Sequence, residues 1–422
     1  MRLEWSVVGI VSRALPAAVL VSLLASGCGG APGSPVGVLQ PSSGVERAEA
    51  DESAPFLELA AGFNDAGFEL WRSQPVEGNM VFSPASVGHA LLMVRAAADT
   101  ATGSAIDAVF ALPDGEAAHD AWNSIDRMIA SDANAQEQIN LTIADRTWPD
   151  VNLEPAQQWI DLLASHHGAT VQPLDFSGDP ASSRDVINSW VSDQTKGLIP
   201  ELLTEGMINQ ETLLMLTDAI YFEASWAVPF YEPFGVVDDF ILLDGSTIQT
   251  DYLHKIDTSD RSALGDGYVA VELPYTGGAF VMVVIVPDEG EFENLRDRLD
   301  QHLINEIDTN LTVRPYELFL PKWETTTNLN LGEWMREVNI APGSYPDIDP
   351  EAFIGGAVHA ADITVDEKGT VAAAATAIDI EGAGPPEPEI TIRADRPFYY
   401  LIRHQATGMI LFAGHVTHPT ES

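Results

Sequence analysis

The stretch from Val365 to Gly384 constrains the fold more than any other part of the chain. It begins as the end of a strand, Ile363 to Val365, and passes a hinge at Gly369 before a run of four alanines, Ala372–Ala375. Side chains of a strand point to opposite faces with a period of two, so the residues after Gly369 can be sorted by parity. One face would carry small or apolar side chains and the other would end in two carboxylates; the two sets are Thr370, Ala372, Ala374, Thr376, Ile378 and Ile380, and Val371, Ala373, Ala375, Ala377, Asp379 and Glu381.

The same stretch runs into Gly382-Ala-Gly-Pro-Pro386, a composition typical of an exposed loop. A segment patterned for the interior of a sheet but placed in a loop predicts two states of the chain, one outside the sheet and one within it. Alanine is also the strongest helix former, so on local propensity an alanine-rich helix or a plain linker stays open.

Charge limits the partners of this chain. It has 422 residues with 63 acidic against 20 basic side chains, a net charge of −43, and a hydrophobic content of 45%, which is ample for a large core. Such a surface repels phosphates and other anionic polymers, so the composition argues against nucleic-acid binding and fits a salty or extracellular environment.

The N-terminal residues resemble an export signal. Arg2 and Arg13 precede an apolar run from Ala14 to Leu24, which is too short to span a membrane permanently. The run ends in Leu24-Ala-Ser-Gly-Cys28, which is similar to a bacterial lipoprotein signal, where the cysteine becomes the lipidated first residue. An ordinary secretory signal with a chance cysteine is the alternative.

Three expectations follow from this signal. Residues 1–27 would be a lipoprotein signal peptide, and residues 28–54, which are rich in Gly, Pro, Ser and Glu, would be a flexible tether. Cys28 is the only cysteine, so the rest of the chain has no disulfide. We therefore expect an exported monomer that meets a membrane only through its lipid anchor.

Hydrophobic periodicity predicts helices first and then many strands, an order typical of the α+β class with large antiparallel sheets. The predicted helices are 56–71, two within 102–132, 155–166, 185–199, 291–307 and 328–338, and the predicted strands are 139–148, 212–222, 236–243, 247–254, 267–274, 279–286, 318–323, 398–402 and 409–416.

Several motifs, in their order and spacing, resemble the serpin family. Residues Glu367-Lys-Gly-Thr370, followed by the four alanines, resemble the proximal hinge of a serpin reactive-centre loop. The string Asn79-Met-Val-Phe-Ser-Pro-Ala-Ser86 resembles the start of the buried second helix, beneath the point where the main sheet opens. Local rules explain Ser83 as an N-cap and Pro84 as the first helical residue, but they do not explain Asn79 or Ser86.

The resemblance covers residues 55 to 419 and implies a serpin domain over residues 55–422. Its fold would have helices packed around three mostly antiparallel β-sheets, with an exposed reactive-centre loop and the helix at 185–199 lying across the main sheet. The implied mechanism is suicide inhibition of extracellular serine or cysteine proteases. A protease attacks the loop, is held as an acyl-enzyme, and is carried along when the cleaved loop inserts into the sheet as a new strand.

The resemblance also implies roles for individual residues. Ser83, Ser86 and His359 match the polar cluster where the sheet parts, and the usual asparagine beside them is Asp218 here, which we expect to contact His359. Glu367 and Lys322 match an ion pair at the top of the sheet, near Trp226; two solvated charges are the alternative. The hinge residues would be Glu367, Gly369, Thr370, Ala372, Ala373, Ala374, Ala375 and Thr376.

Family spacing from Gly369 places the scissile bond at Ala383–Gly384, although the segment is longer than usual and the bond could lie elsewhere between Glu381 and Glu389. Val371 replaces the glutamate common in the family, at a position that should face solvent after insertion. Alanine before the cut suits proteases with a small primary pocket, elastase-like or subtilisin-like, and a glutamate-specific protease is the second choice. No Arg or Lys lies between Val371 and Ile392, so trypsin-like targets are not expected.

No motif argues for an enzyme, a metal or a cofactor: GxSxG, HExxH, CxxC, P-loop and GxGxxG are all missing from the sequence. His166 and His167 could be metal ligands, but only Asp161 lies at a suitable helical spacing. A non-inhibitory serpin that acts as a binding or structural protein is the alternative function, and an unrelated secreted enzyme is a third.

Overall fold

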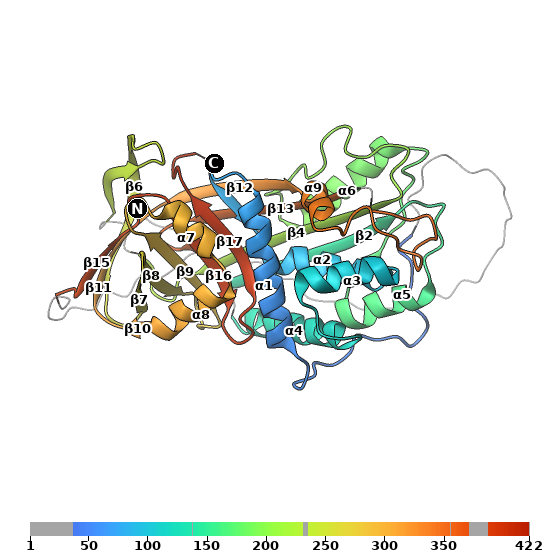
Figure 1. Cartoon of the computed structure of the whole chain (residues 1–422), viewed down its shortest axis with the longest axis horizontal. Coiled ribbons are helices and arrows are strands. Elements are labelled where there is room, and N and C mark those ends of the chain that lie inside the picture. Colours follow the sequence, from blue (N-terminus) through green and yellow to red (C-terminus); the bar gives the residue numbers. More distant parts are fainter. Residues whose placement is uncertain (1–36, 137, 231–234, 355, 371–386, 422) are drawn as a thin grey trace, which may run out of the picture. The chain divides into compact units, whose positions relative to one another are not determined.

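The computed structural model describes residues 37–421 apart from 137, 231–234, 355 and 371–386. Three sheets organise this part of the chain, and they are named sheets A, B and C here (Figure 1). Their strands are mostly antiparallel, as the sequence predicted, and helices pack around them, so the expected α+β architecture is confirmed.

Sheet A has six strands in the order β12-β13-β14-β4-β2-β3. Most neighbours are antiparallel, but β13 and β4 run parallel to each other, as do β2 and β3. Their bounds are β2 Ile139–Pro149, β3 Thr170–Val171, β4 Leu214–Ser225, β12 Trp323–Asn330, β13 Gly356–Val365 and β14 Gly369–Thr370.

Sheet B has seven antiparallel strands in the order β1-β17-β16-β9-β8-β7-β10, and sheet C has four in the order β15-β11-β6-β5. The central strands of sheet B are buried along their whole length, which explains why their sequences are nearly continuous apolar runs. The bounds are β1 Met80–Phe82, β5 Val236–Ile241, β6 Thr247–Asp257, β7 Arg261–Gly265, β8 Tyr268–Pro274, β9 Phe280–Pro287, β10 Thr312–Val313, β11 Tyr316–Pro321, β15 Ile390–Arg393, β16 Phe398–His404 and β17 Ile410–Val416.

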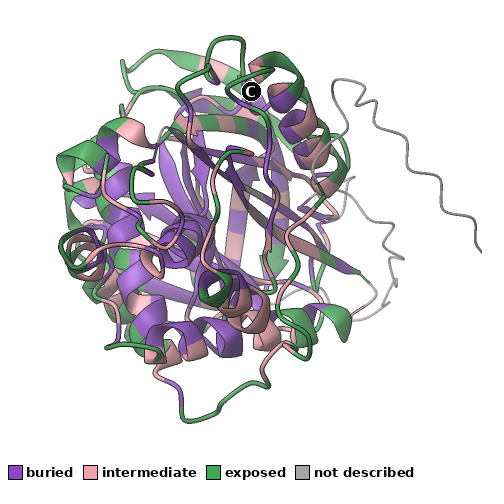
Figure 2. Ribbon diagram, turned by 90° about the vertical axis from the view of Figure 1, so that its right-hand side faces the viewer, coloured by how far each residue is buried: buried purple, intermediate pink, exposed green. Residues whose placement is uncertain are grey.

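The helices cover the sheets, and each buries the face that its sequence makes apolar (Figure 2). Helix α1 packs against α2, α3 and α4, and α6 lies on β4 and β2 over a second apolar cluster that includes Trp148 and Ile187. The bounds are α1 Phe56–Ser73, α2 Pro84–Arg95, α3 Thr100–Phe110, α4 Ala117–Asn134, α5 Gln157–Leu162, the π-helical turn η1 Leu163–His167, α6 Pro180–Gln194, α7 Phe292–Arg298, α8 Gln301–Asn310 and α9 Gly332–Glu337.

Several predicted helices differ from the observed ones. The helix expected over 185–199 is α6, which both begins and ends five residues earlier, and the helix expected over 155–166 is divided into α5 and η1. The single helix expected over 291–307 is broken into α7 and α8, because Asp300 caps a new helix by accepting a hydrogen bond from the Leu303 amide at 2.8 Å. The helix expected over 328–338 begins only at Gly332, because β12 continues as far as Asn330 to complete its pairing with β13.

The expected tether is wrong for residues 37–54, which lie against the body of the domain. The Leu39 amide bonds the Val171 carbonyl at 2.9 Å, and the Ala48 amide bonds the Ser165 carbonyl at 2.8 Å. Arg47 forms an ion pair with Asp126 on α4 at 2.8 Å. Polar composition suggested a free linker, but these polar groups find specific partners on the helices instead.

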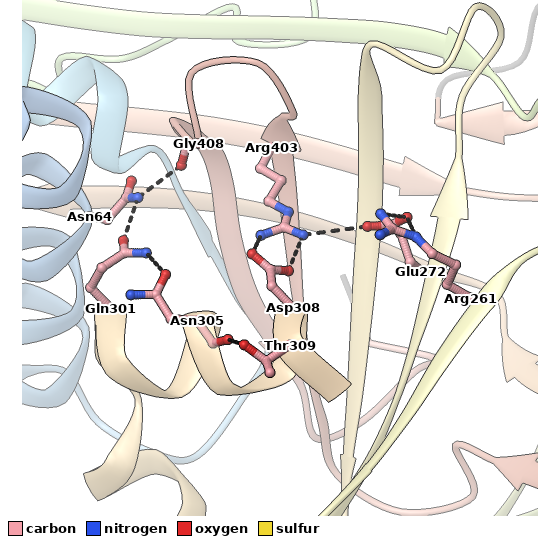
Figure 3. Close-up of polar contacts among 9 residues, drawn as sticks. All are labelled: Asn64, Arg261, Glu272, Gln301, Asn305, Asp308, Thr309, Arg403 and Gly408. Carbon is pink, nitrogen blue, oxygen red and sulfur yellow. Dashed lines mark hydrogen bonds and ion pairs between the residues drawn. The ribbon is translucent and has the colours of Figure 1, made fainter. Parts of the chain in front are cut away.

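A chain of polar contacts ties sheet B to the helices beside it (Figure 3). Arg403 of β16 is buried and binds Asp308 of α8 at 2.8 Å and Glu272 of β8 at 3.4 Å. Asn64 of α1 donates to Gln301 of α8 and to the Gly408 carbonyl, both at 3.0 Å. Buried charges are strongly destabilising unless paired, so this network fixes α8 on the sheet.

Candidate functional site: the hinge of sheet A

The two-residue strand β14 lies between β13 and β4 at one end of sheet A. It is antiparallel to both, with Thr370 paired to Val365 of β13 and to Ala224 of β4. Further along, β13 and β4 pair directly and in parallel, from Gly356 opposite Met215 to Ala361 opposite Ile220. The sheet is therefore already parted at one end, with the first hinge residues in the gap.

Gly369 is required where the hinge enters the sheet. A Cβ atom at this position would collide with the Ala224 carbonyl oxygen and lie 2.8 Å from the Ser225 Cα. Since both atoms belong to the backbone of β4, the clash could not be relieved by a rotamer change. The sequence identified Gly369 as a hinge, and the structure supplies the reason: the backbones approach too closely for a side chain.

Thr370 is anchored from beneath by Tyr275. The two hydroxyl oxygens lie 2.7 Å apart, Thr370 is 1% exposed and Tyr275 is fully buried. Burial raises the pKa of Tyr275, so the phenol stays protonated and can serve as a donor. The Tyr275 ring stacks on Trp226 at a centroid distance of 4.6 Å, which holds the phenol in place.

Trp226 also holds the turn that leads into the hinge. Its indole Nε1–H donates to the Asp366 carbonyl oxygen at 3.0 Å, and its amide donates to the Lys368 carbonyl oxygen at 2.9 Å. The Phe230 amide donates to the Glu367 carbonyl oxygen at 2.9 Å. Three successive backbone carbonyls are thus fixed by the segment that follows β4.

The expected ion pair at this end of the sheet is confirmed, with Lys322 Nζ 2.5 Å from Glu367 Oε1. Partial burial acts to raise the pKa of Glu367, but the hydrogen bond and charge of Lys322 outweigh it and hold the pKa below its ordinary value. Lys322 joins β11 to β12 in the chain, so the pair connects the entry to the hinge with the edge of sheet A.

Beneath the direct β13–β4 pairing lie the predicted polar residues. The Ser83 amide donates to His359 Nε2 at 2.9 Å, and Ser83 Oγ accepts from the Ser86 amide at 3.1 Å as the N-cap of α2. All three residues are buried, and Ser86 Oγ has no hydrogen-bond partner among the described residues. The β13–β4 register places Asp218 next to His359, but the Asp218 side chain lies outside the described residues, so their contact stays a prediction.

Other predicted residues also lie outside the described part of the chain. These are Cys28, the rest of the hinge (Ala372, Ala373, Ala374, Ala375 and Thr376) and the scissile pair Ala383–Gly384. The structure brings together Glu367, Gly369, Thr370, Trp226 and Lys322, while Ser83, Ser86 and His359 form a second group along the same seam.

Two residues that matter here were not predicted as site residues. Tyr275 follows a strand in an ordinary turn, and nothing in the local sequence indicates a contact with Thr370. Asn79 belongs to the serpin-like string, but local rules give it no role. Its Oδ1 accepts from the amides of Thr417 at 2.9 Å and His418 at 3.0 Å, so it holds the C-terminal segment beside β1. Both contacts join residues far apart in sequence.

Within the described ranges, no set of three His, Cys, Asp or Glu side chains is arranged to hold a metal ion. The helices of the same ranges are also too short or too polar for any one of them to cross a membrane.

Comparison with known proteins agrees with this geometry. Residues 62–419 match the family model described as serpin, a serine protease inhibitor. Serpin-Z7 of Hordeum vulgare is 30% identical over 363 residues, which cover 82% of this chain and 91% of that protein. The native structure of the thermophilic serpin tengpin matches with a TM-score of 0.78 at 23% identity, over 89% of this chain and 96% of tengpin. Human thyroxine-binding globulin, solved with its hormone, matches with a TM-score of 0.77 at 24% identity, over 87% of this chain and all of that one. The chain therefore belongs to the serpin family.

Proposed function

We propose that this protein is a suicide inhibitor of extracellular serine or cysteine proteases. The observation that carries the proposal is the placement of β14, which lies between two strands that are otherwise direct neighbours and points along the seam between them. A strand that continued β14 would be antiparallel to both β13 and β4. It would replace one parallel pairing by two antiparallel ones, which are somewhat more stable per residue.

The register of β14 defines which side of the sheet each following residue would meet after cleavage. Thr370 faces the interior, in line with buried Ala224, Phe222 and Ile220 of β4. Residues of even number, from Ala372 to Ile380, would therefore enter the core beneath sheet A, and residues of odd number would face outward. Thr376 would fall opposite His359 and Asp218 if the registers of both strands continue unchanged.

Small side chains would suit insertion of the loop between β13 and β4, because the side chains of both strands are already closely packed in the core. Ala361 and Ile363 of β13 are almost fully buried, as are Phe222 and Ile220 of β4. Parting the two strands to admit a third widens the sheet by about 4.8 Å, so the entering residues must pass between well-packed neighbours. Ile378 and Ile380 would each contribute about 1.5–3 kcal/mol when buried at the end of the movement.

A protease of small primary pocket, elastase-like or subtilisin-like, is the proposed target, cutting at Ala383–Gly384, with a glutamate-specific protease as the second choice. We further propose that the protein is exported and held at the cell envelope by a lipid on Cys28. Replacing Cys28 by serine should release it into the medium, and an unchanged membrane fraction would argue against the anchor.

Binding or carriage of a ligand is the alternative function, and the similarity to thyroxine-binding globulin supports it. The parted sheet and the small-residue hinge favour inhibition instead, since a carrier has no need of a loop patterned to enter a sheet.

Two substitutions at adjacent positions, whose side chains would point to opposite faces of the inserted strand, test the proposal. The parent chain, Ala372→Glu and Val371→Glu are each incubated with elastase, subtilisin and a glutamate-specific protease, and run on denaturing gels. We expect a band at the summed mass for the parent and for Val371→Glu, whose side chain would face outward. Ala372→Glu should be cleaved without an adduct, because a carboxylate would have to enter the core. Cleavage of the parent without any adduct, or equal behaviour of the two variants, would contradict the proposal.

A further inference from the structure

Three buried histidines form a hydrogen-bonded chain on the helical side of the molecule. His89 Nε2 of α2 lies 2.9 Å from His167 Nδ1, and His167 Nε2 lies 2.9 Å from His119 Nδ1 of α4. Each of the three side chains is at most 5% exposed. The chain links α2, α4 and the π-helical turn η1, which are separate in sequence, through side chains alone.

The geometry does not suit a metal ion. His167 uses both of its ring nitrogens, one toward each partner, and these nitrogens point away from each other. A single ion could therefore not bind all three rings. Neutral imidazoles fit without change, because each has one donor and one acceptor, and the two contacts need two donors and two acceptors.

Two features hold the rings in this arrangement. His167 ends the turn η1, whose π-helical backbone is a rare form that is often found at functional sites. The His89 ring stacks on Trp122 of α4 with a centroid distance of 4.0 Å and an angle of 18°. The stacking on Trp122 therefore fixes the orientation of the His89 ring.

Charged and titratable side chains of the N-terminal segment, α2, α3, α4 and η1 lie around the three histidines. Arg47 of the N-terminal segment binds Asp126 of α4 at 2.8 Å, and Arg95 at the end of α2 binds Asp107 of α3 at 2.7 Å. His166, next to His167, lies 3.3 Å from Asp120 of α4. Asp126 and Asp107 are therefore already paired with arginines.

The three hydrogen-bonded histidines can take up few protons before their contacts fail. One extra proton can be placed without loss of either hydrogen bond, because a doubly protonated ring donates on both sides. With a second proton, the three rings would have only one acceptor left for two contacts, so at least one contact would bring two N–H groups together. Acid therefore disrupts the hydrogen bonds between the three histidines, both because two N–H groups repel each other and because buried charges are poorly solvated.

We propose that the His89–His167–His119 chain is an acid-sensitive clasp that holds α2, α4 and η1 together at neutral pH and weakens progressively as the pH falls below about 6. This inference does not depend on the proposed inhibition of proteases.

The direction of the effect follows from proton linkage. Burial lowers the pKa of His119 to about 4, with further lowering from the charges of His166 and Arg95, and burial holds the pKa of His167 well below its ordinary value. The opened state, where the ordinary pKa is near 6.5, binds more protons between pH 4 and pH 6.5, so the closed state is disfavoured as the pH falls through this window. His119 alone would increase the opening equilibrium about twenty-fold between pH 7 and pH 5.

Hydrogen exchange of the full chain tests the clasp. Exchange at pH 7, 6 and 5, scaled by the intrinsic rate at each pH, is followed in peptides from α4, η1 and the buried strand β9. We expect opening in α4 and η1 to increase at least ten-fold from pH 7 to pH 5, while β9 changes far less. His167→Gln should give a smaller increase than the parent chain, because one of the buried rings that take up a proton on opening is gone.

Two controls separate the clasp from general acid sensitivity. His302 is exposed on α8, so His302→Gln should behave as the parent chain does. His415, whose pKa burial lowers to about 4, lies on β17 away from the clasp, and His415→Gln should leave the local opening of α4 unchanged. Protection of α4 and η1 that does not change with pH, or the same acid opening in His167→Gln, would overturn the proposal.

A measurement on the parent chain alone covers the case in which His167→Gln does not fold. Nuclear magnetic resonance of chains labelled at the histidine Cε1 carbon gives the titration of each ring. We expect the His119 and His167 signals to remain those of neutral imidazole down to about pH 5 and then to change together with loss of α4 protection. Titration of either ring near pH 6.5 in the folded protein would overturn the clasp.

Discussion

The hydrogen bond between Thr370 and Tyr275 gives a sharp test of how the hinge is held in sheet A. Replacing Thr370 by valine keeps the shape of the side chain and removes its hydroxyl group. The Tyr275 hydroxyl, which is fully buried and 2.7 Å from Thr370 Oγ1, then loses its partner. An unsatisfied buried hydroxyl costs about 1–3 kcal/mol, so we expect Thr370→Val to lower the free energy of unfolding by that amount.

The matching change, Tyr275→Phe, leaves the Thr370 hydroxyl without its partner and should have a similar cost. In the double variant both polar groups are gone and the site is apolar, so its cost should be no greater than that of either single change. The double-mutant cycle should therefore give a coupling energy of about 1–3 kcal/mol between the two positions.

Urea denaturation of the intact chain at 25 °C, followed by tryptophan fluorescence, measures the four free energies. Equal slopes with urea concentration would show that the same surface is exposed in all four proteins, which makes the comparison valid. Costs that add within about 0.5 kcal/mol would refute the reasoning, because they would mean that the two side chains do not interact.

Three further predictions concern the hinge and a buried charge cluster. Gly369→Ala should expel the hinge from the sheet and increase proteolysis within residues 366–370, whereas Gly37→Ala, where an added Cβ meets no atom within 4 Å, should change nothing. Glu367→Gln removes a partly exposed ion pair and should lower the free energy of unfolding by about 1 kcal/mol or less, in a salt-dependent way that urea denaturation at two salt concentrations would reveal. Lys255→Met leaves two buried aspartates without their cation and should cost about 3–5 kcal/mol at pH 7 in urea denaturation, whereas Lys196→Met, at an exposed position, should cost little. Burial acts to raise the pKa of Asp257, and the charge of Lys255 helps to hold that pKa below its ordinary value, so in Lys255→Met this carboxylate should take up a proton more readily. The cost of Lys255→Met should therefore shrink on acidification, and a cost that grows would contradict the ion-pair assignment.

Much of the architecture could be predicted from local patterns. The continuous apolar runs of β9 and β17 predicted buried strands, and the Ser83–Pro84 pair predicted the start of α2, because these features depend on burial and capping alone. The resemblance to the serpin family rested on motifs such as the hinge and the Asn79–Ser86 string, in their order and spacing. The short strands β3, β10 and β14 were not predicted, because each exists only through its partner in a sheet.

The site was predictable only in part, again because some of its contacts depend on partners that are distant in the sequence. Gly369, Glu367 and Lys322 were found by their resemblance to a motif, but the contact between Tyr275 and Thr370 joins two segments 95 residues apart and has no local signal. The histidines of the clasp were missed for a similar reason. Helical spacing within one segment offers His167 only Asp161 as a neighbour, whereas its partners His89 and His119 lie on other helices.

The most direct test of the account compares the melting temperature of the intact chain with that of a chain nicked once between Glu381 and Glu389. If the freed strand continues β14 between β13 and β4, about ten more residues join the ladder, each adding roughly 1 kcal/mol of hydrogen bonding. We then predict that the nicked protein melts more than about 10 °C above the intact one. A nicked protein that melts at or below the temperature of the intact chain would contradict the central claim, that sheet A holds a place for its own loop.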